Sequence, residues 1–206
     1  AKNGIDFISC SDVMINSPLD VLKDDQKPYT VFTPYYRKAV KLDVRTPELN
    51  FFSNYISLDE VNSINNKYII VLNDFYVKTL TDEKRNFNIY VKGGRLEALD
   101  LLEKIDKCRY ESLRDIAYEE ATSKLSAHLK FGCVSIREVF YKGLEIGNDM
   151  FIRQLYWRDF FLQILYHFPK VLGHSFNSKF ENVDWKKDKD NFDKWKSGMT
   201  GFPIVD

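Results

Sequence analysis

Cysteine, glycine and proline are scarce in this chain of 206 residues, and each shortage excludes a class of protein. The three cysteines, Cys10, Cys108 and Cys133, stand far apart, which argues against a disulfide framework and against the CxxC spacing of a zinc site. Nine glycines and six prolines exclude collagen-like and low-complexity chains. This pattern fits a reduced intracellular protein without a metal site, and it leaves nucleus and cytoplasm both open.

An excess of charge of one sign is also missing, because 30 basic residues balance 30 acidic ones. Net charge therefore gives no sign of a polyanionic partner, although charge segregated on one face is compatible with such a partner. Long hydrophobic runs are missing too, since Arg153, Arg158 and Asp159 interrupt the most apolar stretch, residues 151–168. Such charges cost about 3 kcal/mol each at the centre of a membrane, so the stretch predicts a buried helix and no membrane span. Aromatic residues, in contrast, make up 15% of the chain, which suits a pocket for a large flat ligand.

The first 45 residues have a mixed pattern. The apolar runs 5–9 and 12–16 are candidate strands. Thr33 followed by Pro34 predicts the start of a helix, because threonine caps helices well and proline lacks an N–H that the first turn leaves unpaired. We interpret this part as the end of an α/β domain.

Residues 46–94 show no sustained hydrophobic period and are rich in Asn, Asp and Lys. Ser57 and Glu60 form a candidate capping box, and 68–72 is an apolar run typical of a strand or a buried turn. We interpret this segment as an ordered linker with short elements.

The remaining residues, 95–206, have the pattern of an all-α domain. Helices are expected at 95–105, where Leu96, Leu99, Leu102 and Ile105 share one face, and at 122–132. A capping box of Ser135 and Glu138 predicts the start of a third helix, and a fourth is expected at 150–168, up to Pro169. The helix at 150–168 is apolar on nearly all sides and should be central in a bundle. The alternating charges of 184–198 indicate an exposed helix or loop.

The predicted fold class is therefore α+β overall. It consists of the C-terminal tail of an α/β, Rossmann-like domain at 1–45, an interdomain linker at 46–94, and an incomplete all-α domain at 95–206. The chain starts without Met and stops within an apolar run, so we interpret both ends as cut.

A mixed stripe of aromatic and polar side chains marks the central helix. Helical spacing places Phe151, Gln154, Arg158, Phe161 and Leu165 on one face, with Trp157 beside it. A buried arginine needs an anionic or hydrogen-bonding partner. Arg158 and Asp159 are neighbours that should point apart, so a carboxylate from another helix is the ordinary explanation and a ligand is the other.

Hydroxyl groups gather at the start of another helical segment, at Thr122, Ser123 and Ser126. Unpaired N–H groups and the positive end of the helix dipole suit a phosphate there, whereas a plain N-cap is the simpler explanation. Neither a Walker loop nor a GxGxxG turn occurs in the chain.

Four blocks of sequence together resemble the DNA photolyase/cryptochrome family of flavoproteins. They are KPYTVFTPYYR (27–37), TSKLSAHLKFGCVSIREVFY (122–141), RQLYWRDFFLQILYHFP (153–169) and WKSGMTGFPIVD (195–206). The first block is similar to the end of the family's α/β antenna domain, and the other three are similar to the first part of its helical FAD-binding domain.

The resemblance implies FAD as the cofactor, together with an antenna chromophore of folate or deazaflavin type. It implies that FAD is bound by Tyr110, Thr122, Ser123, Lys124, Leu125, Ser126, Phe151, Gln154, Arg158 and Phe161. It also implies that Gln154, Trp157 and Arg158 contact DNA, and that Gln154 and Trp157 act in catalysis.

The activity implied is that of a deoxyribodipyrimidine photolyase, a carbon-carbon lyase. Reduced FAD donates an electron, driven by light, to a pyrimidine dimer flipped from UV-damaged DNA. Family members that repair cyclobutane dimers usually carry Glu where this chain has Gln154, and those that repair six-four photoproducts carry Gln; YHFP and SIREV are more similar to the first group. The alternatives are a blue-light photoreceptor and a non-catalytic remnant. A separate polypeptide supplying the later helices is a further expected partner.

Overall fold

The computed structural model of the chain describes residues 12–48, 53, 57, 59, 60, 89–107, 110–116 and 118–206. These residues fall into two compact units, one up to Ile164 and one from Leu165 to Asp206. The expected strands at 5–9 and 68–72 lie outside the described residues, as does most of the expected linker.

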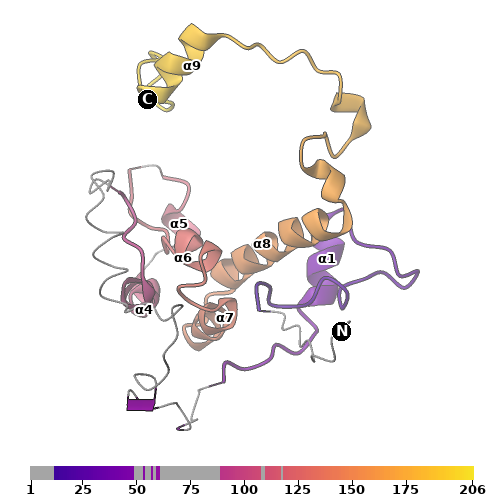
Figure 1. The fold of residues 1–206 in the computed structure, drawn as a ribbon, viewed down its shortest axis with the longest axis vertical. Coiled ribbons are helices and arrows are strands. Elements are labelled where there is room, and N and C mark those ends of the chain that lie inside the picture. Colours follow the sequence, from indigo (N-terminus) through magenta and orange to yellow (C-terminus); the bar gives the residue numbers. More distant parts are fainter. Residues whose placement is uncertain are drawn as a thin grey trace. The chain divides into compact units, whose positions relative to one another are not determined.

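The first unit is helical. Its helices are α1 (Phe32–Ala39), α4 (Arg95–Glu103), α5 (Tyr110–Leu113), α6 (Ser126–Lys130), α7 (Ile136–Glu145) and α8 (Asp149–His167), which runs on into the second unit, with a 3₁₀ turn at Ile105–Lys107 (Figure 1). Within the described ranges the only β pairing is an isolated bridge between Leu22 and Pro28. The prediction that 95–206 is helical is thus confirmed for its described part.

The expected strand at 12–16 is wrong, because these residues form a series of bends. Their backbone is held by side chains of α8 and not by a neighbouring strand: the N–H groups of Ile15 and Asn16 donate to the carboxylate of Asp159, at 2.6 and 3.4 Å. A carboxylate that accepts two successive N–H groups replaces the sheet ladder that a strand would need.

Helix α1 begins earlier than its sequence indicates. Its N-cap is Val31, which makes no side-chain capping bond, and Thr33 already lies in the first turn. Pro34 still fits, because the N–H groups of the whole first turn have no partner within the helix. Helix α1 buries Phe32, Tyr35 and Ala39, so its first residue already packs in the core.

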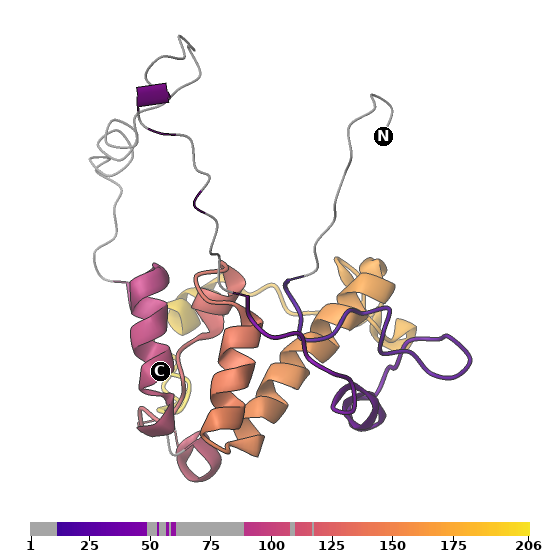
Figure 2. The same cartoon turned by 90° about the horizontal axis from the view of Figure 1, so that it is seen from below.

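Helix α8 is central, as its composition predicts. Its buried side chains are Phe151, Ile152, Leu155, Tyr156, Asp159, Phe160 and Gln163. Helix α1 crosses it (Figures 1 and 2), and the ring of Phe32 stacks on Trp157 with centroids 3.6 Å apart and planes at 9°. Further aromatic contacts join the pairs Tyr35–Phe160 and Tyr36–Tyr156. Six aromatic residues, Phe32, Tyr35, Tyr36, Tyr156, Trp157 and Phe160, therefore pack α1 onto α8.

Helices α7 and α8 approach closely at Gly143. A methyl group built there would lie 2.9 Å from Ile152 Cγ1 and 3.3 Å from Phe151 Cδ1. We expect Gly143→Val to lower the free energy of unfolding by about 2–3 kcal/mol, because an overpacked core must shift. Gly93→Ala, which meets no atom within 4 Å, is the control and should change stability little. Urea unfolding followed by circular dichroism measures both, and a Gly143→Val protein as stable as the parent would contradict the packing.

The face predicted for 95–105 is confirmed except at its first member, because Leu99 packs against the core and Leu102 and Ile105 are buried. Leu96 is 82% exposed, and Ala98, which was not expected on this face, is buried. Arg95 at the start of α4 pairs with Glu138 of α7 at 2.5 Å. The capping boxes predicted at Ser57 with Glu60 and at Ser135 with Glu138 are both confirmed.

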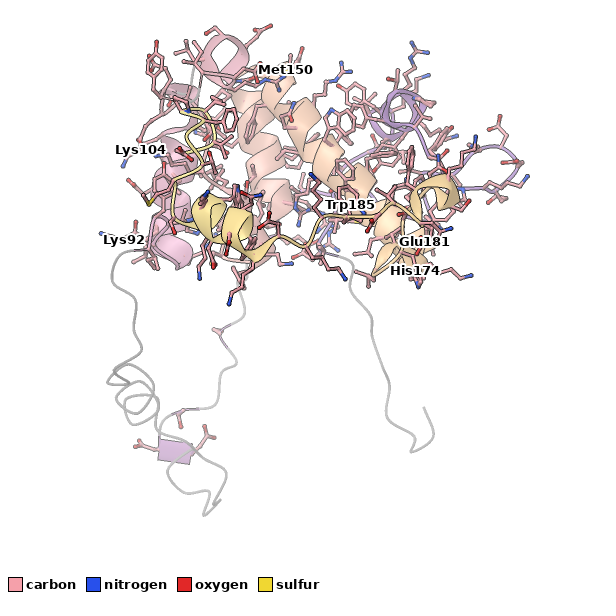
Figure 3. The ribbon with its side chains drawn as sticks, turned by 90° about the horizontal axis from the view of Figure 1, so that it is seen from above. Lys92, Lys104, Met150, His174, Glu181 and Trp185 are labelled. Carbon is pink, nitrogen blue, oxygen red and sulfur yellow. The ribbon has the colours of Figure 1, made fainter. Side chains whose placement is uncertain are left out.

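The second unit contains 3₁₀ turns at Pro169–Val171 and Ser178–Phe180, and helix α9 (Lys189–Lys196). Helix α8 ends at His167, so Pro169 terminates it as predicted, and α9 buries no side chain, as its alternating charges indicate. His174 Nδ1 lies 2.8 Å from Glu181 Oε1 (Figure 3). The Asp206 carboxylate accepts hydrogen bonds from the N–H and hydroxyl groups of Thr200.

Candidate functional site

A cavity of about 330 Å³ lies between α6 and α8 in the first unit. We call it the α6/α8 cavity; its lining residues are Ser123, Leu125, Ser126, Leu129, Lys130, Phe151, Gln154, Leu155, Arg158 and Leu162. Six of the residues expected to bind a cofactor meet here: Ser123, Leu125, Ser126, Phe151, Gln154 and Arg158.

The hydroxyl-bearing segment enters α6 through a tight bend. Lys124 adopts a positive φ of 54°, which is uncommon outside glycine. The Ser123 hydroxyl accepts a 3.4 Å hydrogen bond from the N–H of Leu125, the N-cap residue of α6. This bend brings the Ser123 and Ser126 side chains to one wall of the cavity.

Two neighbours in the same segment do not line the cavity. Lys124 forms an ion pair with Glu120 at 2.7 Å, and its ammonium lies 4.9 Å from the centre of the Tyr90 ring. Thr122 is exposed. Tyr110 begins α5, and its side chain lies outside the described residues.

The opposite wall comes from α8, where Phe151, Gln154 and Arg158 recur at intervals of three and four residues and so share a face. Phe151 is buried, whereas Gln154 and Arg158 are partly exposed. The wall thus offers an aromatic ring, an amide that both donates and accepts, and a guanidinium.

Arg158 has two protein partners. Its Nη1 donates a 2.6 Å hydrogen bond to the carbonyl oxygen of Val13, and the same nitrogen lies 3.5 Å from Asp159 Oδ1. The expectation that Arg158 and Asp159 point apart is therefore wrong, because the Val13 carbonyl draws the guanidinium back across the helix. Burial lowers the pKa of Arg158, which stays far above neutral pH in any protein setting.

Sequence reasoning missed Asp159, whose side chain is fully buried. Oδ2 accepts the two N–H groups of Ile15 and Asn16, while Oδ1 has no hydrogen bond among the described residues. Burial is the main cause that raises the pKa of this carboxyl to about 7. The position of this acidic residue within an otherwise apolar helix was the sequence signal that could have identified it.

Trp157 and Phe161 lie outside the α6/α8 cavity. The indole of Trp157 stacks on Phe32 of α1 and also faces Phe161 at 5.8 Å. Phe161 is 62% exposed. The stripe expected on α8 is therefore divided, with Phe151, Gln154 and Arg158 on the cavity and Trp157 in the packing of α1.

A second, larger cavity of about 540 Å³ shares Leu129, Lys130 and Arg158 with the first. Arg95 and Glu138 also border it and are paired with each other. Arg158 therefore stands in the wall between two cavities. Among the residues that the structure describes, no group of three acidic, histidine or cysteine side chains could hold a metal ion, and no helix is long and apolar enough to cross a membrane.

Comparisons with known proteins show what this arrangement is similar to. A family model described as the FAD binding domain of DNA photolyase matches residues 151–206. A deoxyribodipyrimidine photo-lyase of Alkalihalophilus pseudofirmus is 31% identical over 224 aligned positions, which cover 100% of this chain and 43% of that protein. The chain is thus similar to the photolyase family, over its whole length in one of these comparisons. A second photo-lyase, from Halobacterium salinarum, is 39% identical over 112 positions, or 49% of this chain and 23% of that one.

The structural comparison agrees with this similarity. The crystal structure of a bacterial class III photolyase from Agrobacterium tumefaciens matches 94% of this chain and 42% of its own, with a TM-score of 0.66 and 25% identity. The present chain thus spans less than half the length of these photolyases.

The residues of the α6/α8 cavity fit the chemistry of the flavin cofactor that gives the photolyase domain its name. FAD combines a diphosphate with a flat, largely apolar ring system that carries hydrogen-bonding edges. The hydroxyls of Ser123 and Ser126 and the cation of Lys130 stand beside apolar Phe151 and the amide of Gln154. A cavity of about this size lies at the small end of the range for ligand sites, so it accommodates part of such a molecule.

Proposed function

We propose that the chain provides one side of the FAD site of a DNA photolyase. The observation that carries the proposal is the meeting of Ser123, Ser126, Phe151, Gln154 and Arg158 at one cavity, from two segments more than twenty residues apart. An ordinary core does not require serine hydroxyls before one helix to face aromatic, amide and guanidinium groups on another helix, whereas a ligand site does.

In this proposal the side chains of the cavity bind and orient. The Ser123 and Ser126 hydroxyls donate to phosphate oxygens, and Lys130 and Arg158 offset their charge. Phe151 packs against flat ring surface and excludes water, while the Gln154 amide hydrogen-bonds a ring edge or a flipped base. Reduced FAD, when bound, supplies the electron that splits a pyrimidine dimer, and the protein supplies position and electrostatics.

We extend the proposal to the expected substrate and chain organisation. The substrate is UV-damaged DNA, with cyclobutane dimers as the lesion, and the reaction is a light-driven lyase reaction. Residues 1–45 form the end of the antenna domain, 46–94 the linker, and 95–206 the first part of the FAD-binding domain. The two named relatives are deoxyribodipyrimidine photo-lyases, which supports this reading of the chain.

Flavin affinity tests the proposed site. We expect Ser123→Ala combined with Ser126→Ala to weaken FAD binding at least tenfold, since each hydrogen bond to a charged phosphate contributes about 1.5–3 kcal/mol. Fluorescence polarisation of FAD titrated with the chain measures this. Ser178→Ala, an exposed serine in the second unit, is the control and should bind FAD like the parent. Equal affinity in the double variant and the parent would remove the α6/α8 cavity from consideration.

A further inference from the structure

Three polar side chains of α8 bind the backbone of residues 13–29, which we call the N-terminal segment. Arg158 donates to the Val13 carbonyl at 2.6 Å, Asp159 accepts from Ile15 at 2.6 Å, and Gln163 Nε2 donates to the Tyr29 carbonyl at 2.7 Å. Asp159 and Gln163 are fully buried. These hydrogen bonds attach the segment to α8 through its main-chain atoms, in addition to the apolar packing of Ile15 and Val21.

Arg158 and Asp159 hold the two ends of one short stretch. The carboxylate fixes Ile15 and Asn16, and two residues before Ile15 the Val13 carbonyl fixes the guanidinium. A long arginine side chain has many rotamers, and ordering it costs about 2 kcal/mol. A partner that is already rigid adds no ordering cost of its own. The carbonyl of Val13 is such a partner only while the backbone beside it is held.

We propose that Asp159 is a positioning residue for Arg158: through the backbone of Val13 to Asn16 it holds the guanidinium in the wall shared by the two cavities. Asp159 itself touches neither cavity, since neither lining includes it. The ligand of Arg158 at this wall follows from the proposed flavin function. The positioning of Arg158 by Asp159 involves only residues of this chain and does not depend on a ligand.

The charge state of Asp159 controls the strength of this attachment. A carboxylate accepts N–H hydrogen bonds about twice as strongly as a neutral acid. The charged groups that act on Asp159 are Arg158 of α8 and Arg137 of α7. Tyr35 of α1 and Tyr156 of α8 face it as neutral groups, and their pKa values are raised chiefly by burial and further by the Asp159 charge. Arg137 pairs with Asp12, so its own charge is partly offset. The pKa of Asp159, about 7, places the change of charge near neutral pH.

Arginine reactivity tests the proposal without any flavin. Phenylglyoxal modifies accessible guanidinium groups, and peptide mass spectrometry gives the rate at Arg158 relative to Arg153. Arg153 lies on the same helix, is exposed, and rests over the rings of Phe32 and Tyr36. We expect Asp159→Asn to raise the ratio of the Arg158 rate to the Arg153 rate about threefold or more, because the amide accepts more weakly and loses the attraction to Arg158. Asp149→Asn, an exposed acid at the start of α8, should leave it unchanged.

A second experiment measures the same ratio of Arg158 and Arg153 rates over a series of pH values. It can be carried out on the parent chain and so does not depend on the folding of a variant. In the parent chain the ratio should rise as pH falls from about 8 to about 6, where Asp159 takes up its proton. In Asp159→Asn it should stay flat. A ratio unaffected by both the substitution and pH would overturn the proposal, as would equal acceleration at Arg158 and Arg153, which indicates general loosening. A chain that shows the expected shift but binds no FAD keeps the positioning role and loses the proposed function.

Discussion

Trp157→Ala is expected to lower the free energy of unfolding of the chain by about 3–5 kcal/mol, the usual cost of removing a packed aromatic side chain. The indole joins α1 to α8 through its stack on Phe32, and it also contacts Phe160 and Phe161. Its removal would leave a cavity at this junction. Urea unfolding followed by circular dichroism measures the loss.

Two other tryptophans serve as controls for this prediction. Trp185 and Trp195 are 74% and 59% exposed, so their replacement by Ala should cost far less. The competing hypothesis, that Trp157 stacks on a flipped base, predicts unchanged stability and a selective loss of affinity for dimer-containing DNA. A Trp157→Ala protein with the stability of the parent would refute the packing role and favour that hypothesis.

Asp159 should make the chain less stable as pH rises from about 4 to about 7. The folded state keeps the proton of this carboxyl up to its raised pKa, about 7, whereas the unfolded chain releases it near 3.8. Because the folded state binds more protons in that window, the free energy of unfolding falls with rising pH. The full effect of such a shift is on the order of 4 kcal/mol.

The comparison of Asp159→Asn with the parent isolates this effect. Other acids, such as Glu138, whose pKa is lowered chiefly by its hydrogen bond to Arg95, contribute the opposite slope but are common to both proteins. The stability of Asp159→Asn relative to the parent should therefore rise between about pH 4 and about pH 8. Urea unfolding at several pH values measures it, and parallel curves for the two proteins would show that Asp159 ionises normally.

Local rules predicted the parts of the fold that depend on neighbouring residues. The capping boxes at Ser57 and Ser135, the end of α8 before Pro169 and the exposed α9 follow from spacings of a few residues. The predicted cap at Thr33 and the buried Leu96 were wrong, because distant contacts decide those positions. Tertiary packing overrides a preference worth about 1 kcal/mol.

The candidate site was predicted only in part, because some of its residues follow from local spacing and others from distant contacts. Periodicity placed Gln154 and Arg158 on one face of α8, and the hydroxyl cluster indicated Ser123 and Ser126. No pattern along the chain could pair Asp159 with Ile15, which lies 144 residues away. The sequence also could not show that Trp157 faces α1, since it lies at the border of the stripe.

The footprint of FAD in amide hydrogen exchange tests the central claim most directly. Mass spectrometry of the chain with and without FAD should show increased protection in 122–130 and 151–162, the two segments that line the α6/α8 cavity. Residues 36–44, which border a separate cavity between α1 and α7, should show none. Protection at 36–44, or no change at 122–130 and 151–162 at saturating FAD, would contradict the assignment of the flavin to this cavity.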